Sequence, residues 1–186
     1  MANYSLFISV SDVKATSFVD EGMDDLTIKK AIYTAQQVHL LPILGTALYD
    51  KLDTDIAAGT LASPYTTLAT KVKQALVWAS IYEGIYPFAI KMRNKGIVQQ
   101  SGDNTQNVDF SELNSLKGDA QTKMEIFLQR VTNYLEENSS SFTEYENPGT
   151  GLDTIHPDKS SYNTTWFLGN GGGCYMRGGP NSTEDI

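Results

Sequence analysis

The sequence has little of what disulfide-stabilised, metal-binding and membrane proteins depend on. Its 186 residues include one cysteine and two histidines, which excludes an internal disulfide framework and a cysteine-rich zinc site. No apolar run reaches the roughly 18 residues of a membrane span. The best candidate, residues 75–90, is interrupted by Glu83, Gly84 and Pro87. The first eleven residues hold no lysine or arginine, so we expect neither a signal peptide nor membrane association.

Positive charge is also scarce. Fourteen lysines and arginines face 22 acidic residues, giving a net charge of -8, and such a chain is poorly suited to grip nucleic acid through its overall field. The exception is residues 64–98, where five basic residues accompany the single acid Glu83. This candidate basic contact strip could meet an acidic neighbour, although a solvated helix face is the simpler interpretation. The strip consists of Lys71, Lys73, Lys91, Arg93 and Lys95.

The chain divides into two parts by texture. Residues 1–138 carry periodic apolar positions, whereas residues 139–186 hold 8 of the 15 glycines and 3 of the 6 prolines. We predict a helical domain over 1–138 and a Gly/Ser-rich extension over 139–186, which in isolation buries too little apolar area to order itself. The extension nevertheless carries aromatic residues that suggest anchors docking on its own body or on a neighbour. The candidate anchors are Tyr162, Trp166, Phe167 and Tyr175.

The first part is predicted to be helical throughout. A short helix begins near Ser11, and a second begins at Asp24 and Asp25, continues with apolar residues at helical spacing, and ends before Pro42. A third, from about residue 46, ends at Gly59. Asp109-x-x-Glu112 resembles a capping box for a last helix that extends to about Glu137 and that Gly118 could split. No run alternates as a strand would. The predicted fold is an all-α bundle of four or five helices with a long extended C-terminal arm.

The segment from Tyr65 to Asn94 is apolar on nearly every side, with Pro87 expected to kink or break it. A helix of this kind is central in a bundle or buried between subunits. A chain of this size offers few other helices to cover it, so we predict that a second copy covers part of it. At helical spacing its aromatic residues are more typical of a core or subunit interface than of a ligand pocket. The candidate subunit interface residues are Trp78, Tyr82, Tyr86 and Phe88.

Nothing in the sequence favours an enzyme. Cys174 and His156 form the one cysteine–histidine pair, but both lie in the glycine-rich extension, which is a poor setting for a nucleophile that needs a rigid, water-limited site. The run Gly169–Gly173 lacks the Lys and Ser/Thr of a phosphate-binding loop. His39 has no second ligand at helical spacing and is expected to be a hydrogen-bonded core or interface residue. We predict no catalytic, cofactor or metal site.

The first sixty residues carry a series of motifs in a fixed order. Val10-Ser11-Asp12-Val13-Lys14 opens a short helix, an acidic turn follows at Asp24-Asp25, and Ile28-x-x-x-Ile32-x-x-Ala35 comes next. The series ends with Ile43-Leu44-Gly45-x-x-Leu48-Tyr49-x-x-Leu52. In this order the chain resembles the head–tail connector, or adaptor, proteins of tailed bacteriophages. The resemblance implies a small helical bundle assembled as a dodecameric ring beneath the portal. That ring extends the DNA channel, carries no catalytic residues and gives the tail a docking surface.

These observations predict a structural virion protein in the phage neck, made in the host cytoplasm. Its partners would be further copies of itself, the portal protein, and other neck or tail ring proteins. DNA would pass through without sequence-specific binding, because a negative ring repels phosphates. Two alternatives remain open: a helical adaptor outside phages that binds a protein through the basic strip, and a Cys174/His156-dependent enzyme.

Overall fold

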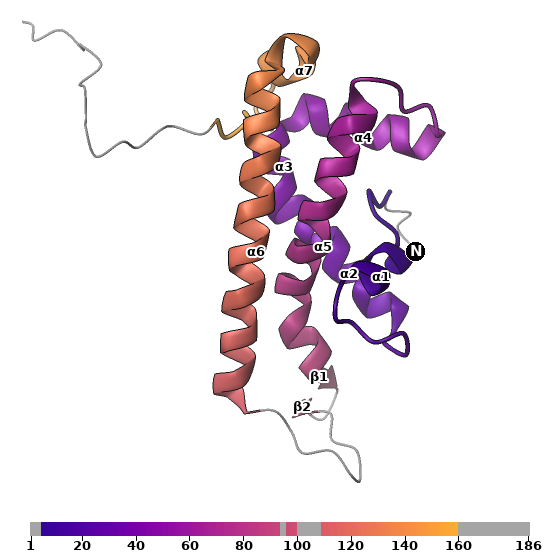
Figure 1. The fold of residues 1–186 in the computed structure, drawn as a ribbon, viewed down its shortest axis with the longest axis vertical. Coiled ribbons are helices and arrows are strands. Elements are labelled where there is room, and N and C mark those ends of the chain that lie inside the picture. The colour runs from indigo at the N-terminus through magenta and orange to yellow at the C-terminus, as the bar shows by residue number, and fades with distance from the viewer. Residues whose placement is uncertain (1–4, 94–95, 100–108, 160–186) are drawn as a thin grey trace, which may run out of the picture.

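The computed structural model describes residues 5–93, 96–99 and 109–159, and these form a helical bundle with one short β-ribbon (Figure 1). The N-terminal part holds α1 (Val10–Thr16), α2 (Asp25–Ala35), a π-helical turn (Gln36–Leu40), α3 (Leu41–Leu44) and α4 (Thr46–Ala58). The long helices α5 (Tyr65–Ala89) and α6 (Phe110–Glu137) follow, joined through β1 (Ile90–Arg93) and β2 (Gly96–Gln99). A 3-10 turn (Ser139–Ser141) and α7 (Thr143–Glu146) complete the order.

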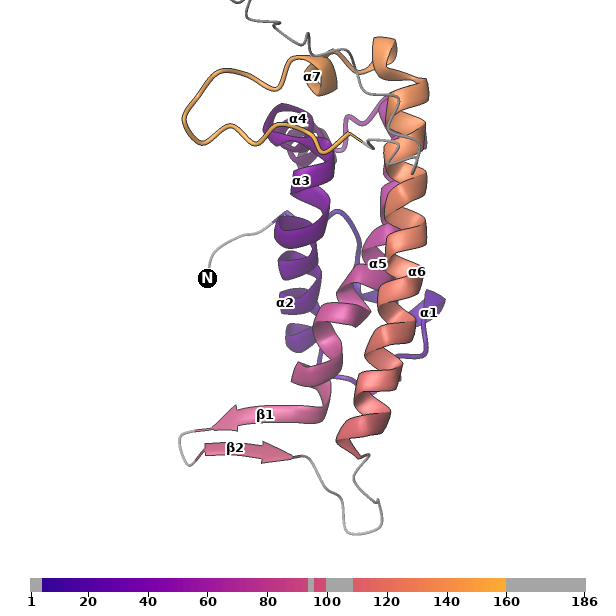
Figure 2. The same cartoon turned by 90° about the vertical axis from the view of Figure 1, so that its left-hand side faces the viewer.

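The antiparallel pair of α5 and α6 forms the axis of the molecule, and α2 lies along the other flank of α5 (Figure 2). The predicted all-α bundle is confirmed. No helix among the described residues combines the length and apolarity needed to cross a bilayer.

Local sequence determines where the helices begin. Ser9 caps α1 reciprocally with Asp12, and the hydrogen bonds from Ser9 hold the pKa of the Asp12 carboxyl below its usual range. Asp24 caps α2 by accepting from the Leu26 and Thr27 backbone N–H groups. Asp109 caps α6 by accepting from the backbone N–H of Phe110. These caps satisfy the backbone donors that a helix leaves free at its start.

Helix α6 is one continuous rod. The prediction that Gly118 splits it is wrong, because a single exposed glycine costs only about 1 kcal/mol and the residues on both sides of it pack on α5.

The second helix does not end before Pro42, contrary to prediction. It widens into the π turn, where the Leu41 N–H donates to the Gln36 carbonyl, and continues as α3. Pro42 then occupies the first turn of α3, a position that requires no backbone donor. The chain breaks three residues later instead, at Gly45, whose φ of 74° lies in the left-handed region.

The π turn places Gln36 at the centre of a buried hydrogen-bond network. Its side-chain oxygen accepts from the Phe7 N–H at 3.1 Å. Its amide nitrogen donates to the Ser5 carbonyl at 3.2 Å and to the Tyr49 hydroxyl at 3.1 Å. One fully buried amide therefore joins the N-terminal segment and α4 to α2.

We expect Gln36→Leu to lower the free energy of unfolding by about 1–3 kcal/mol, because the substitution leaves the buried Phe7 N–H without an acceptor. Urea unfolding measures the change. Gln37→Leu is the matched control, since among the described residues Gln37 donates only to the Tyr49 hydroxyl, which Gln36 still binds. Equal losses in the two variants would contradict a central role for Gln36.

The segment from Tyr65 to Asn94 is not helical to its end, because α5 stops at Ala89 and the β-ribbon begins at Ile90. Pro87 ends α5 two residues later, consistent with the expected break, and the chain then turns into β1. Strands β1 and β2 pair antiparallel, with Ile90 opposite Gln99 and Arg93 opposite Gly96. The prediction of no strand missed this ribbon, because four-residue strands are too short to show alternation. The ribbon projects from the end of the bundle (Figure 2).

Helix α5 is covered by its own chain, which removes the main argument for a covering copy. Its buried positions include Leu68, Val72, Leu76 and Ile81, and they pack against α6 on one flank and α2 on the other. The 28-residue α6 is long enough to follow α5 along its whole length. The prediction of a covering copy considered how few helices the chain has, but not how long they are.

The packed body extends past residue 138. Phe142 and Tyr145 are 0 % and 1 % exposed and belong to the core, where the Phe142 ring meets those of Tyr65 and Tyr134 edge-on. The predicted boundary at 138/139 is therefore too early for these two aromatic residues. The candidate anchors Tyr162, Trp166, Phe167 and Tyr175 lie outside the described residues.

Beyond α7, residues 154–158 form a strap across the turn between α3 and α4. The Thr46 N–H donates to the Ile155 carbonyl at 3.0 Å, and the Ile155 N–H donates to the Thr46 hydroxyl at 2.8 Å. The Asp158 N–H donates to the Pro42 carbonyl at 2.8 Å. A Cβ at Gly45 would lie 2.8 Å from the Pro157 ring, so the strap crosses where only glycine fits.

We expect Gly45→Ala to destabilise the protein by about 1–3 kcal/mol, through its positive φ and its contact with Pro157. Pro157→Ala removes the contacting ring atoms, so the double variant should recover part of the loss. A double-mutant cycle in urea separates the two terms. Strictly additive losses would show that the strap does not press on Gly45 in solution.

Candidate functional site

The predicted interface aromatics Trp78, Tyr82 and Tyr86 recur every four residues on α5 and so share one stripe. All three are half-buried and lie along one edge of the α5–α6 contact. Phe88 lies apart from them, with its ring packed over Gly84, where an added Cβ would come within 2.3 Å of it. The structure thus brings together three of the four candidates.

Lysine ammonium groups lie over the faces of these rings. Lys117 Nζ lies 4.6 and 4.4 Å from the ring centroids of Tyr82 and Tyr86. Lys123 Nζ lies 4.5 Å from Trp78. Farther along the same contact, Lys71 of α5 lies 4.9 Å from the ring of Tyr134. An ammonium over an aromatic face is stabilised by about 0.5–1 kcal/mol at exposed sites, so these contacts hold the lysines in place while their charge stays near water.

Two exposed aromatic residues flank this band. Phe18, 54 % exposed, packs on Trp78 at 6.2 Å between centroids. Phe110, 57 % exposed, stacks on Tyr86 at 5.9 Å, and the Tyr86 hydroxyl donates to Asn114. We call this band the lysine–aromatic seam. It consists of Phe18, Lys71, Trp78, Tyr82, Tyr86, Phe110, Lys117, Lys123 and Tyr134.

The predicted basic contact strip does not form one face of a helix. Lys71 belongs to the seam, whereas Lys73 lies 3.9 Å from Asp12 of α1. Lys91 and Arg93 occupy alternate positions of β1, and Lys95 lies outside the described residues. The end of α5 at Ala89 separates the strip into a helical part and a ribbon part.

His39 makes the predicted hydrogen bond. Its Nε2 lies 2.8 Å from Glu83 Oε1, and its ring meets Tyr82 edge-on. The partner, 44 residues away, gave no signal in the sequence. His156 is exposed in the strap, and Cys174 lies outside the described residues. Within the parts of the chain that the structure describes, no three His, Cys, Asp or Glu residues group as metal ligands.

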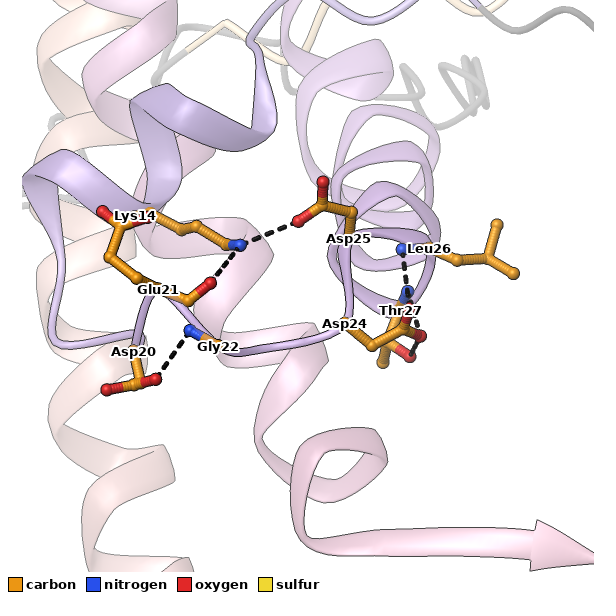
Figure 3. Close-up of polar contacts among 8 residues, drawn as sticks. All are labelled: Lys14, Asp20, Glu21, Gly22, Asp24, Asp25, Leu26 and Thr27. Carbon is orange, nitrogen blue, oxygen red and sulfur yellow. Dashed lines mark hydrogen bonds and ion pairs between the residues drawn. The ribbon is translucent and has the colours of Figure 1, made fainter.

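An open cleft of about 880 Å³ lies beside α1 and is lined by three lysines and three carboxylates. Lys14 Nζ crosses it to the Glu21 carbonyl and to Asp25, both at 2.7 Å (Figure 3). Asp20 accepts from Gly22 in the adjoining turn. These contacts fix the start of α2, and the balanced charges favour no ligand of either sign.

A second charged region, the acidic end, lies where α4, α7 and the last turns of α6 meet (Figure 2). Nine carboxylates and three cations (Lys51, Arg130 and Lys159) give it a net charge of -6, from 3 minus 9. Its carboxylates are those of Asp50, Asp53, Asp55, Glu136, Glu137, Glu144, Glu146, Asp153 and Asp158.

The negative charge of the acidic end contributes to raised pKa values at two tyrosines. Burial, a hydrogen bond to Glu144 and the charges of Glu144 and Asp55 raise the pKa of Tyr65 to about 12. Burial, followed by the charges of Glu136, Glu146 and Asp158, raises the pKa of Tyr145 to about 12. The Tyr145 hydroxyl is also buried without a hydrogen-bond partner in the described part of the chain.

Residues 40–155 match a family described as "Family of unknown function (DUF6712)". The chain belongs to this DUF6712 family. The matched residues run from the end of the π turn into the strap. They include the acidic end apart from Asp158 and Lys159, and all of the seam except Phe18. No curated protein and no solved structure matches the chain, so the family membership leaves the function open.

The two tyrosines should respond oppositely to loss of their hydroxyls. We expect Tyr145→Phe to raise the free energy of unfolding by up to about 1 kcal/mol, because it removes a buried, unpaired hydroxyl. Tyr65→Phe should lower it by about 1 kcal/mol, because it loses the bond to Glu144. Thermal unfolding at neutral pH measures both effects.

Alkaline pH provides a further test of the same pair. A tyrosine whose pKa is raised on folding contributes stability below its unfolded value near 10, and that contribution is lost as pH approaches about 12. Wild-type stability should therefore fall between those values, and less steeply in Tyr145→Phe. Parallel curves for the wild type and this variant would contradict the raised pKa.

Proposed function

We propose that this DUF6712 protein is a structural subunit of a ring in the neck of a tailed bacteriophage. The ring joins the portal to the tail and extends the DNA channel. The resemblance of the first sixty residues to connector proteins suggests this role, and the described elements are compatible with it. Helix α1 begins after Ser9, Asp24 caps α2, and Gly45 separates α3 from α4.

The lysine–aromatic seam is the observation that carries the proposal. The chain covers the buried side of α5 by itself but leaves a band of half-buried and exposed aromatic residues along the α5–α6 contact. Protein interfaces are enriched in tyrosine, tryptophan and phenylalanine at their centres. A ring subunit needs such a lateral surface on each copy.

The ends of the molecule also suit a stacked assembly. The β-ribbon projects at one end of α5, and residues 143–159 pack at the opposite end (Figure 2). A subunit between two other rings uses projections of this kind to reach both. A charge of -8 on each copy, repeated around a channel, would repel DNA phosphates and let the genome slide.

The test is assembly with the portal protein encoded in the same genome. Size-exclusion chromatography with light scattering should show a ring-sized complex with the portal, even if the protein alone is smaller. Trp78→Ala should weaken this complex, because it removes the centre of the seam. Phe88→Ala is the control, since Phe88 lies off the seam on the same helix.

Circular dichroism of both variants distinguishes lost assembly from lost folding. A folded wild-type chain that stays monomeric and never binds the portal or a tail-ring protein would contradict the proposal. Density for this chain in a micrograph of the particle neck would establish the location.

A further inference from the structure

The seam presents held cations that lack an acidic partner. Lys117 lies over two rings, and no carboxylate of the described residues lies within ion-pair distance of it. Lys71 is in the same position over Tyr134, whereas Lys123 also pairs with Asp119 at 2.7 Å. Because the rings already hold these side chains, binding an anion would cost them little further rotamer freedom.

The acidic end carries charge that its own helices do not favour. Glu136 and Glu137 are exposed in the last turn of α6, which contains no basic residue. A carboxylate near a helix C-terminus opposes the helix dipole by about 0.3–1 kcal/mol. Functional surfaces commonly carry residues that are not the most stabilising choice, so these exposed carboxylates are candidate contact residues.

We propose that the acidic end of one copy docks on the lysine–aromatic seam of the next. The occupant is a second copy of this chain because the two surfaces are opposite in charge. Glu136 and Glu137 would meet Lys117 and Lys123 over a floor of tyrosine and tryptophan rings. This docking rests on the proposed ring and names the two surfaces that close it.

The contact is heterologous, because each copy offers its seam to one neighbour and its acidic end to another. Head-to-tail contacts of this kind close into rings when the rotation between copies permits. Because the charged groups lie at surfaces open to water, the contact should also weaken as salt rises.

Charge reversal tests the pairing directly. Lys117→Glu with Lys123→Glu makes the seam acidic, and Glu136→Lys with Glu137→Lys makes the end basic. We expect each double variant to lose more than about a hundredfold in association constant, measured by light scattering and sedimentation. Combining all four substitutions in one chain, or mixing the two double variants, should restore association, because opposite charges face each other again.

Folding is checked by thermal unfolding of every variant. The reversal at Glu136 and Glu137 should leave the melting temperature unchanged or raise it, since lysine suits a helix C-terminus, so its loss of association cannot come from unfolding. Lys29→Glu with Lys30→Glu on α2 is the matched control and should assemble as the wild type does. If the reversed seam does not fold, Lys117→Gln with Lys123→Gln replaces it, with a smaller loss of association expected.

Association is measured for the chain alone and on the portal ring, which separates the docking from the proposed function. Variants that form rings on the portal as the wild type does would overturn the docking and leave the function standing. Failure of the four-fold variant to recover would also overturn it. A chain that self-associates with the charge-swap pattern but never binds the portal would uphold the docking and overturn the function.

Discussion

The burial of α5 is the constraint on which the rest of the fold depends. Its eleven buried residues lie on more than one side of the helix, so a single neighbour cannot remove them from water. The chain meets this demand with α6 along one flank and α2 along the other. Without both flanks, α5 would expose an apolar face. The connection between α5 and α6 must therefore reverse the chain direction, so that α6 packs antiparallel against α5.

Sequence reasoning located the features of this fold that depend on neighbouring residues. The starts of α1 and α2, the end of α4 at Gly59 and the break after Pro87 follow from side chains acting on their own backbone. The predicted end before Pro42 failed because a π turn shifts the hydrogen-bond register by one residue, and that turn is stabilised by Gln36 binding to Ser5, Phe7 and Tyr49. No local pattern contains those distant partners.

The boundary at residue 138 failed for a related reason. The composition of residues 139–186 indicates how much apolar area this segment has. It does not indicate whether the rest of the chain offers a surface on which that area can be buried. Phe142 fits between Tyr65 and Tyr134, and Pro157 crosses at Gly45, across sequence separations of up to 112 residues. Two aromatic residues pack on the surface that α5 and α6 form, and hydrogen bonds to Pro42 and Thr46 hold the strap that follows. A glycine- and serine-rich texture therefore does not by itself mark the end of a folded body.

The sequence predicted the aromatic residues of the candidate site but not the lysines that lie over them. The spacing of Trp78, Tyr82 and Tyr86 indicated an aromatic stripe, but the lysines above it come from α6, and their register depends on how the two helices pair. The same pairing changes what the stripe means. An aromatic stripe covered by a helix is core, whereas one edged by held ammonium groups remains a surface with a preferred sign of partner. The apolar character of α5 therefore accounts for the stability of the single chain, whereas the proposed assembly depends on the lysines at the edge of the stripe.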